Sequence, residues 1–405
     1  MGPEDRSALL AGAAEVVPLD ELEHKLDLAR PLRIKLGVDP TAPAVTLGWA
    51  VVLRKLRQFQ DAGHVAVLII GDFTARVGDP SGKSETRPRL SKEQVREYTD
   101  RILGEFWIVL DEARTEVRYN AEWLEPLDME GILRLTASTT VARMLERDDF
   151  AARYAANRPI SLMEFLYPLM QAMDSVAVQA DVELGGTDQK FNLLVGRDVQ
   201  RAHGQEPQVA LTMPLLVGTD GVQKMSQSLG NYIAITDPPD EMFGKLASVP
   251  DSLIADYRLL ALDFFGDPAE HDRVSNGLAD GSLDPWEEKR RMARDVVDLY
   301  HGQGEGQAAE ERFFRVHRDR AFPAKVEELD AWKHLGQGSP AMFWLPRVLS
   351  GTGLVSNKSS ARRLIEQGGV RLDGEKVIDP DSEFTMEELR GKVLQVGRRR
   401  FVRLT

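Results

Sequence analysis

The chain has 405 residues, 42% of them hydrophobic, and this length predicts two or three domains with sizeable cores. It contains no cysteine, which excludes disulfides, thiolate metal sites and cysteine nucleophiles. No apolar run is long enough to cross a bilayer, and the acidic residues of Met1–Asp20 do not fit a signal peptide. We therefore expect a cytoplasmic protein that does not associate with membranes.

The net charge of −13 is unevenly distributed along the chain. Arg347–Thr405 contains 12 Lys or Arg and 8 Asp or Glu, a net charge of +4, so the rest of the chain carries −17. A basic end on an acidic body is typical of an appended RNA-binding module. A solvated charged tail explains the same pattern equally well, so charge alone does not decide between them.

The N-terminal half has the element order of a doubly wound α/β domain. Arg33–Val38 predicts a short strand, and the apolar spacing of Leu47–Gln60 predicts a helix that Gly63 closes. Val65–Ile70 is a continuous apolar run with β-branched residues, which indicates a strand buried on both faces of a parallel sheet. Ligands of such a sheet bind at the carboxyl ends of its strands.

The middle of the chain predicts two helices and a further strand. Thr136–Tyr154 predicts the first helix, and Ser161–Ser175 predicts the second. Ser161 and Glu164 have the spacing of a capping box, which marks the start of that second helix. A buried strand is expected around Gln208–Leu211.

Beyond the Asp-Pro-Pro sequence at 237–239, the chain divides into a helical part and a mixed part. Glu241–His317 has a helix-rich composition without strand-like alternation, and Gly336–Pro340 is typical of a linker. The last segment predicts a helix at Ser359–Gln367, followed by short strands separated by glycine turns. These strands are expected at residues 370–372, 392–396 and 401–404.

Five segments contain polar side chains next to glycines or on an apolar helix, a combination typical of binding loops and pockets. They are residues 37–50, 71–83, 167–174, 185–192 and 220–231. The first leads into a helix whose free N–H groups favour an anion, and Gly48 allows a close approach to the backbone. The second follows a buried strand, where Asp79 could hold an ammonium group and Lys83 could meet phosphate or RNA. An ordinary helix start and an ordinary glycine turn are the alternatives.

The other three segments carry side chains suited to polar ligands. Tyr167, Gln171 and Asp174 stand at i, i+4 and i+7, on one helical face that could line a pocket for a polar, aromatic ligand. Asp188 could accept hydrogen bonds from ribose hydroxyls, and the loop around Lys224 is suited to moving over a polyphosphate. A partly exposed stripe and solvated loops are the alternatives that each segment alone leaves open.

Together, these segments resemble bacterial tyrosyl-tRNA synthetases of class I, in the subgroup with a KMSKS-type loop. Gly37–Trp49 stands where the family has GxDPTxxxxHxGH, and Gly71–Gly82 is similar to GDFTxxxGDPSG. Gly185–Gln189 resembles GG(S/T)DQ, and Lys224–Ser228 resembles KMSKS. The resemblance covers almost the whole chain, and Arg347–Thr405 resembles an S4-type RNA-binding domain.

The resemblance implies a tyrosine site and a role for its residues. Asp174 would accept a hydrogen bond from the phenol hydroxyl, and Asp79, Tyr167 and Gln171 would receive the α-ammonium group. Phenylalanine would leave the buried carboxylate unpaired, which is a basis for rejecting it. The positions that match the family's tyrosine site are Lys35, Gly37, Asp39, Asp79, Tyr167, Gln171, Asp174 and Gln189.

The resemblance also implies the reaction, in which tyrosine and ATP give tyrosyl-adenylate and pyrophosphate before the tyrosyl group passes to the 3′ end of tRNA. Such catalysis rests on positioning and on stabilising charge at the phosphates. Mg²⁺ is implied together with ATP, and the 7 scattered histidines do not indicate a metal site of the protein's own. The implied ATP-binding residues are Gly48, Gly186, Asp188, Lys224 and Met225. The implied catalytic residues are Thr46, Gly48, Trp49, Lys224, Ser226 and Gln227.

Partners and domains follow from the same resemblance. Relatives are homodimers, in which Thr139–Phe150 would take part in the contact, and the RNA partner would be tRNA-Tyr. The implied RNA-binding residues are Lys358, Arg362, Arg363 and Arg371. The expected architecture is a Rossmann-like catalytic domain at residues 1–220, a KMSKS-type loop with a helical anticodon-side domain at 221–335, a linker at 336–346 and a small α+β S4-like domain at 347–405.

The departures from the family pattern fall at the ATP end of the site. The two histidines of HxGH are Thr46 and Trp49 here, and Gln227 replaces the second lysine of KMSKS while Lys224 remains. Each preorganised donor lost at such a site costs about 10²–10³ in rate. The tyrosine pocket and the basic end keep the family pattern.

Three interpretations follow. The first, which we favour, is a working tyrosyl-tRNA synthetase with compensating donors, such as a divergent or inhibitor-resistant paralogue. The second is a synthetase-like enzyme of a specialised biosynthetic pathway that uses tyrosine, an analogue or tRNA with altered ATP chemistry. The third is a non-catalytic protein that binds RNA or tyrosine. Trp49 either fills the adenine site or turns outward, and the sequence does not say which.

Overall fold

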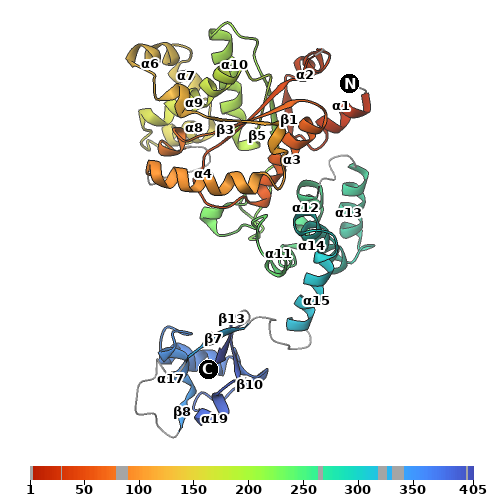
Figure 1. The fold of residues 1–405 in the computed structure, drawn as a ribbon, viewed down its shortest axis with the longest axis vertical. Helices are drawn as coiled ribbons and strands as arrows, with labels where there is room; N and C mark the ends of the chain where they lie inside the picture. The colour runs from red at the N-terminus through yellow and green to blue at the C-terminus, as the bar shows by residue number, and fades with distance from the viewer. Residues whose placement is uncertain are drawn as a thin grey trace. The chain divides into compact units, whose positions relative to one another are not determined.

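The structure, a computed structural model, describes residues 3–28, 30–78, 90–262, 268–317, 326–330, 342–397 and 400–405. The chain forms two compact units, Met1–Gly306 and Gln307–Thr405 (Figure 1). Within the described ranges, no helix is long and apolar enough to span a membrane.

A six-stranded sheet forms the centre of the first unit, in the order β1-β6-β5-β2-β3-β4. Neighbouring strands pair in parallel, except for the antiparallel pair β1 and β6. The chain proceeds from β2 to β3 and β4 on one side and from β5 to β6 on the other, so the strand order reverses between β2 and β5. Ligands of doubly wound sheets bind at such a reversal. The strands are β1 (Glu15–Val17), β2 (Arg33–Val38), β3 (Val65–Ile70), β4 (Thr115–Tyr119), β5 (Val182–Gly186) and β6 (Val209–Met213).

Helices pack against this sheet, with α3, α9 and α10 in contact with its central strands (Figure 1). The predicted doubly wound α/β class is therefore confirmed. The helices of the N-terminal part are α1 (Pro3–Leu10), α2 (Leu19–Leu26), α3 (Leu47–Asp61), α4 (Lys92–Phe106), α5 (Ala121–Leu124), α6 (Met129–Thr136), α7 (Val141–Met144), α8 (Asp148–Ala155), α9 (Leu162–Val178) and α10 (Lys190–Ala202). Farther along the chain follow α11 (Pro239–Leu246), α12 (Ile254–Ala261), α13 (Pro268–Asp280), α14 (Pro285–His301) and α15 (Glu305–His317).

The local signals in the sequence explain most of these element bounds. The Thr46 side chain caps α3, and the predicted capping box of Ser161 and Glu164 begins α9. The single helix predicted at Thr136–Tyr154 is wrong, because α6 ends at Thr136 and two separate short helices, α7 and α8, follow. The backbone of Thr140 is extended, and its side chain accepts a hydrogen bond from Arg143 N, which begins a new helix. The predicted helix was too long because the hydrophobic periodicity continues past this break.

The second unit contains a five-stranded sheet in the order β10-β9-β12-β13-β7. A buried apolar cluster from α17, α18 and these strands forms its core. The predicted helix and three strands near the C-terminus are confirmed as α18, β9, β12 and β13. The elements are β7 (Glu327–Leu329), β8 (Phe343–Trp344), α17 (Leu345–Gly351), α18 (Lys358–Glu366), β9 (Val370–Leu372), β10 (Glu375–Val377), β11 (Glu383–Phe384), α19 (Met386–Leu389), β12 (Val393–Val396) and β13 (Arg400–Leu404).

The expected domain limits differ from these units, because the second unit already begins at Gln307, within α15. Glu327–Leu329, expected within the helical domain, forms β7 and pairs with β13 in the second unit. Residues 336–341 of the expected linker lie outside the described residues, whereas Phe343–Trp344 forms β8 and Leu345 begins α17. The division at residue 220 remains a prediction.

Candidate active site

A cavity of about 560 Å³ lies in the first unit, where the strand order reverses. Its wall comes from the ends of β2, β3 and β5, the first turns of α3, the inner face of α9 and residues 224–228. A volume of 300–1,000 Å³ is typical of small-molecule sites. The cavity therefore has both the place and the size of a ligand site in a doubly wound fold.

Asp174 on α9 is a buried acid on the wall of this cavity, with 4% of its surface exposed. The indole Nε1 of Trp123 donates to Asp174 Oδ1 at 2.8 Å, and Asn120 Nδ2 donates to Oδ2 at 3.4 Å. Burial raises the pKa of Asp174 to about 7, although the charge of Lys35 and the two hydrogen bonds act in the opposite direction. Asp174 is thus an oriented acceptor that a ligand hydroxyl can reach.

Tyr167 and Asp39 form a second polar group at the cavity. The Tyr167 hydroxyl donates to Asp39 Oδ2 at 2.8 Å, and the Thr74 hydroxyl donates to Oδ1 at 2.7 Å. A side chain at Gly71 would overlap Asp39 Oδ1, so glycine is required where β3 ends. These two hydrogen bonds fix the orientation of the Asp39 carboxylate and of the Tyr167 ring at the cavity.

A buried ion pair lies beneath the cavity. Lys35 and Glu183 are partners on β2 and β5 and are 0% and 1% exposed. The Lys35 ammonium donates to Glu183 Oε1 at 2.9 Å, to Ser175 Oγ at 2.8 Å and to the Gln171 carbonyl at 2.9 Å. Since all three N–H groups are used, Lys35 supports the wall from below. Lys35 is not among the residues that line the cavity, and its place in the tyrosine site remains a prediction.

The Gln171 side chain connects this ion pair to the cavity. Gln171 Nε2 donates to Glu183 Oε1 at 3.0 Å, and Gln171 Oε1 accepts from Asn192 Nδ2, also at 3.0 Å. Asn192 Nδ2 also lies 3.2 Å from Gln189 Oε1. The orientation of the Gln171 amide is therefore fixed, with its oxygen toward the side of the site where Gln189 lies.

Thr46 and Trp49 lie at the other end of the cavity, at the start of α3. Thr46 Oγ1 accepts from Trp49 N at 3.3 Å, as an N-cap. The Trp49 ring lies against Phe106, with ring centroids 6.2 Å apart and planes tilted by 33°. Both aromatic side chains line the cavity. The indole therefore forms part of the wall, and the space beside it stays open.

Residues 224–228 close over this same end. Lys224 Nζ pairs with Asp188 Oδ2 at 2.5 Å. Met225 packs onto the start of α3, since a Cβ at Gly48 would lie 3.4 Å from the Met225 Cβ. Gln227 Nε2 donates to the carbonyl oxygen of Ala44. A Cβ at Gly186 would meet Leu215 at 2.6 Å, which explains the second glycine of the 185–186 pair.

The remaining predicted residues fall into separate groups. Gly37, Asp39, Gly186, Asp188, Gln189 and Ser226 line the cavity. Asp79 and Lys83 lie outside the described residues. The expected RNA-binding residues lie in the second unit, where Arg362 pairs with Asp381 and Arg371 donates to the Gly374 carbonyl. Lys358 and Arg363 belong to α18.

Among the described residues, no group of three or more His, Asp or Glu is arranged to hold a metal ion.

Sequence reasoning missed Asn120 and Trp123, which orient Asp174. Asn120 also receives the Phe73 N–H and donates to Thr74, so it connects the ends of β3 and β4. The two residues stand 54 and 51 positions from Asp174 along the chain, and only the pairing of β4 beside β3 brings them to α9. β4, which precedes Asn120, was not predicted from the sequence and is only partly buried, so no local pattern pointed to these two residues.

Comparison with known proteins gives a consistent result. The chain matches the family described as tRNA synthetases class I (W and Y) over residues 27–318 and the S4 domain over residues 343–388. It is 51% identical to the tyrosine–tRNA ligase of Moorella thermoacetica, over 98% of this chain and 94% of that protein. It is 49% identical to the tyrosine–tRNA ligase of Geobacter sulfurreducens, over the full length of both.

A solved structure is also similar. The tyrosyl-tRNA synthetase of Archaeoglobus fulgidus, complexed with L-tyrosine, superposes with a TM-score of 0.62 and 25% identity. The match covers 76% of this chain and 98% of that one. Two lines of comparison, sequence and fold, thus converge on one family.

The raised pKa of Asp174 predicts a pH-dependent stability. Between its ordinary value of 3.8 and about 7, the folded protein holds this proton more tightly than the unfolded chain. This carboxyl therefore lowers the free energy of unfolding as pH rises from about 4 to about 7, by up to about 4 kcal/mol, and the loss then levels off. Asp174→Asn has no carboxyl to titrate at this position. In urea unfolding, the free energy of unfolding of the variant should therefore rise relative to that of the wild type over this pH range. A constant difference between the two proteins from pH 4 to 8 would contradict the raised pKa.

Proposed function

This chain belongs to the tyrosine–tRNA ligases of the class I tRNA synthetase family, and we propose that it activates tyrosine with ATP and transfers it to tRNA-Tyr. The observation that carries the proposal is the buried, oriented carboxylate of Asp174 at the cavity. A phenol hydroxyl that donates to this carboxylate satisfies it, whereas an unsubstituted phenyl ring leaves it unpaired. The S4 match at residues 343–388 supports an RNA acceptor.

The amino-acid end of the cavity also has residues placed to bind the α-ammonium and carboxylate groups of tyrosine. Tyr167 and Gln171 both line the cavity and would meet the α-ammonium group, with Asp79 expected beside them from the sequence. Asp39 holds the Tyr167 hydroxyl and so acts through it. This arrangement directs the tyrosine carboxylate toward the start of α3, where the nucleotide would lie.

The nucleotide end has the features that ATP requires. Gly48 and Gly186 leave space for close approach of adenine and ribose, and Asp188 is placed to accept from ribose hydroxyls. The partial positive charge at the start of the 15-residue helix α3 favours the phosphates, although Leu47 N and Trp49 N already donate within the protein. Lys224, now paired with Asp188, supplies a cation that can exchange that partner for phosphate. Mg²⁺ would enter with ATP.

The reaction then needs positioning more than acid–base chemistry. A tyrosine carboxylate oxygen attacks the α-phosphorus, the bond to the β-phosphate breaks, and pyrophosphate leaves with the electron pair. A terminal ribose hydroxyl of tRNA next attacks the tyrosyl carbonyl, and AMP leaves. The chain's contribution is to hold the carboxylate and phosphates together and to stabilise the charge on the leaving pyrophosphate.

The replaced histidines lower the rate of the first step without closing the site. Trp49 lies on the cavity wall against Phe106, so it leaves room for a nucleotide. Thr46 keeps a hydroxyl whose oxygen caps α3 and whose hydrogen remains available to a phosphate. The relatives named above are tyrosine–tRNA ligases, and they offer no support for a specialised pathway or a non-catalytic role.

Pyrophosphate exchange tests this proposal directly. The wild type should exchange pyrophosphate into ATP only when tyrosine is present. Thr46→His with Trp49→His should raise the exchange rate by at least about tenfold, because each restored donor stabilises charge worth about 10²–10³ in rate. Trp49→Phe keeps the contact with Phe106 and adds no donor, so it should bring no gain. Absence of exchange in the wild type and in the double variant would refute the proposal.

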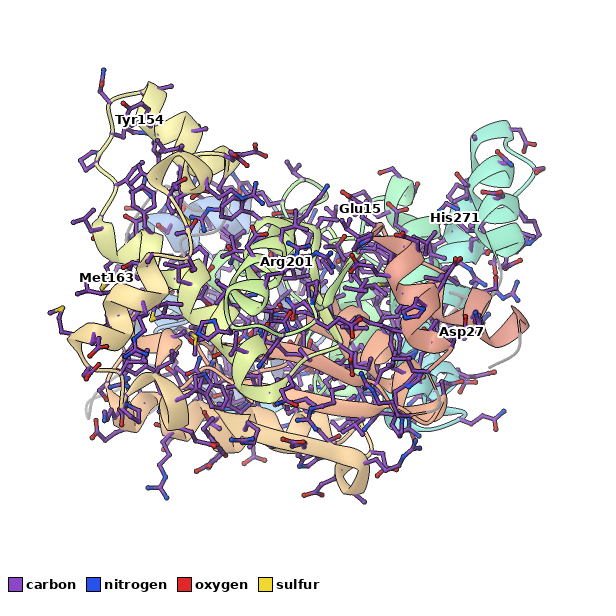
Figure 2. All side chains as sticks on the ribbon, turned by 90° about the horizontal axis from the view of Figure 1, so that it is seen from above. Glu15, Asp27, Tyr154, Met163, Arg201 and His271 are labelled. Atoms are coloured by element: carbon purple, nitrogen blue, oxygen red, sulfur yellow. The ribbon has the colours of Figure 1, made fainter. Side chains whose placement is uncertain are left out.

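We further propose that two copies of the chain form a dimer through α6, α7, α8 and the start of α9. Of the 16 exposed large apolar side chains among the described residues, six fall within residues 129–162. These helices lie together at one side of the first unit (Figure 1), and Tyr154 and Met163 lie on the same outer side (Figure 2). An apolar surface of this kind marks an interface, and a symmetric pair would bury it. The six are Met129, Ile132, Leu133, Val141, Tyr154 and Leu162.

Light scattering after gel filtration tests the dimer. A charge at the centre of the interface is costly to bury, so Leu133→Glu with Val141→Glu should elute as a monomer while the wild type elutes as a dimer. Ile378→Glu replaces an equally exposed residue of the second unit and should leave the dimer intact. A wild type that is monomeric at micromolar concentration would contradict this interface.

A further inference from the structure

We propose that Gln227 is a positioning residue that fastens residues 224–228 over the nucleotide end of the cavity before ATP binds. This inference rests on the proposed function, because it assigns that end to ATP. In the family pattern the position belongs to the second lysine of KMSKS, and here a neutral amide replaces it. The structure gives this amide a defined partner within the protein.

The contact connects two segments that are far apart in the sequence. Gln227 begins the short 3-10 helix Gln227–Leu229, and its Nε2 donates to the carbonyl oxygen of Ala44, 183 residues earlier. Ala44 is buried, with 8% of its surface exposed, and stands two residues before the cap of α3. The bond thus joins the loop to the backbone that leads into the nucleotide end.

The Ala44 end of this bond is rigid. The next residue, Val45, donates its N–H to Glu105 Oε2 at 2.5 Å and accepts from Ile235 N at 2.9 Å. Leu47 N donates to the Ile233 carbonyl at 2.9 Å. Since the backbone on this side is held by α4 and by residues 233–235, the Gln227 bond restrains the loop and not its anchor.

The base of the loop is fixed as well. Asn231 is 4% exposed, accepts from Ser226 N at 2.8 Å and donates to Asp220 Oδ2 at 2.8 Å. With the base held by Asn231 and the tip held by Gln227, the residues between them have little freedom. Met225 is therefore kept against Gly48, and Lys224 is kept beside Asp188.

Because Gln227 is uncharged, closure of residues 224–228 does not depend on attraction to the phosphates of ATP. A lysine at this position carries a charge that the phosphates attract, whereas the Gln227 bond forms without any nucleotide. ATP binds the closed arrangement in this proposal, so the apparent affinity for ATP is proportional to the fraction of molecules whose loop is closed. One hydrogen bond of this type changes that fraction by roughly three- to tenfold. Gln227 therefore acts on the Michaelis constant for ATP and leaves tyrosine binding unchanged.

Hydrogen–deuterium exchange of the full-length, ATP-free protein tests the proposal. Gln227→Met keeps the length of the side chain and removes its donor without adding charge. Peptides covering Lys224–Gly230 should then exchange roughly three- to tenfold faster than in the wild type. Gln223→Met is the matched control, since Gln223 is exposed and its side chain has no partner among the described residues. An unprotected loop in the wild type, or equal exchange in Gln227→Met, would overturn the proposal.

Steady-state kinetics separates a positioning role from a general loss of stability. In Gln227→Met the Michaelis constant for ATP should rise roughly three- to tenfold, with kcat at saturating ATP within about twofold and the constant for tyrosine unchanged. A fall in kcat alone contradicts the proposal. The exchange experiment needs no turnover, so a wild type without pyrophosphate exchange removes the proposed function and leaves the result on the loop interpretable.

Discussion

The site depends on keeping one carboxylate, that of Asp174, buried and correctly oriented. Burying an unpaired acid is costly, and the protein meets that cost with the indole N–H of Trp123, the amide of Asn120 and the nearby charge of Lys35. Each of these comes from a different element: α5, the end of β4, and β2. The surroundings of this carboxylate are therefore complete only when these three elements meet in the folded first unit.

The two ends of the cavity are built in different ways. The amino-acid end rests on the Lys35–Glu183 pair and on side chains whose hydrogen bonds are already made within the protein, so its shape is fixed before a ligand arrives. The nucleotide end is closed by loops, glycines and bonds that ATP can replace. The departures from the family pattern are compatible with the local structure, because Thr46 caps α3 and Trp49 packs on Phe106.

Sequence reasoning predicted the parts of this account that are local or periodic. Strands β2, β3 and β6, the capping box of α9 and the polar face of Tyr167, Gln171 and Asp174 follow from spacing and composition, whereas β1, β4 and β5 were not predicted. The helix at 136–154 was wrong because a cap at Thr140 interrupts a periodic pattern. The ion pair of Lys35 with Glu183 was not predicted, because it depends on the register of β2 against β5. Contacts between distant segments, such as that of Gln227 with Ala44, have no signal in a single sequence.

The most direct measurement is calorimetric titration of the ATP-free protein with tyrosine and with phenylalanine. If Asp174 recognises the phenol hydroxyl, tyrosine should bind at least about tenfold more tightly than phenylalanine, because the missing hydroxyl leaves a buried acceptor unpaired. The preference should disappear in Asp174→Asn. Equal binding of the two amino acids to the wild type, or binding of neither, would contradict the account.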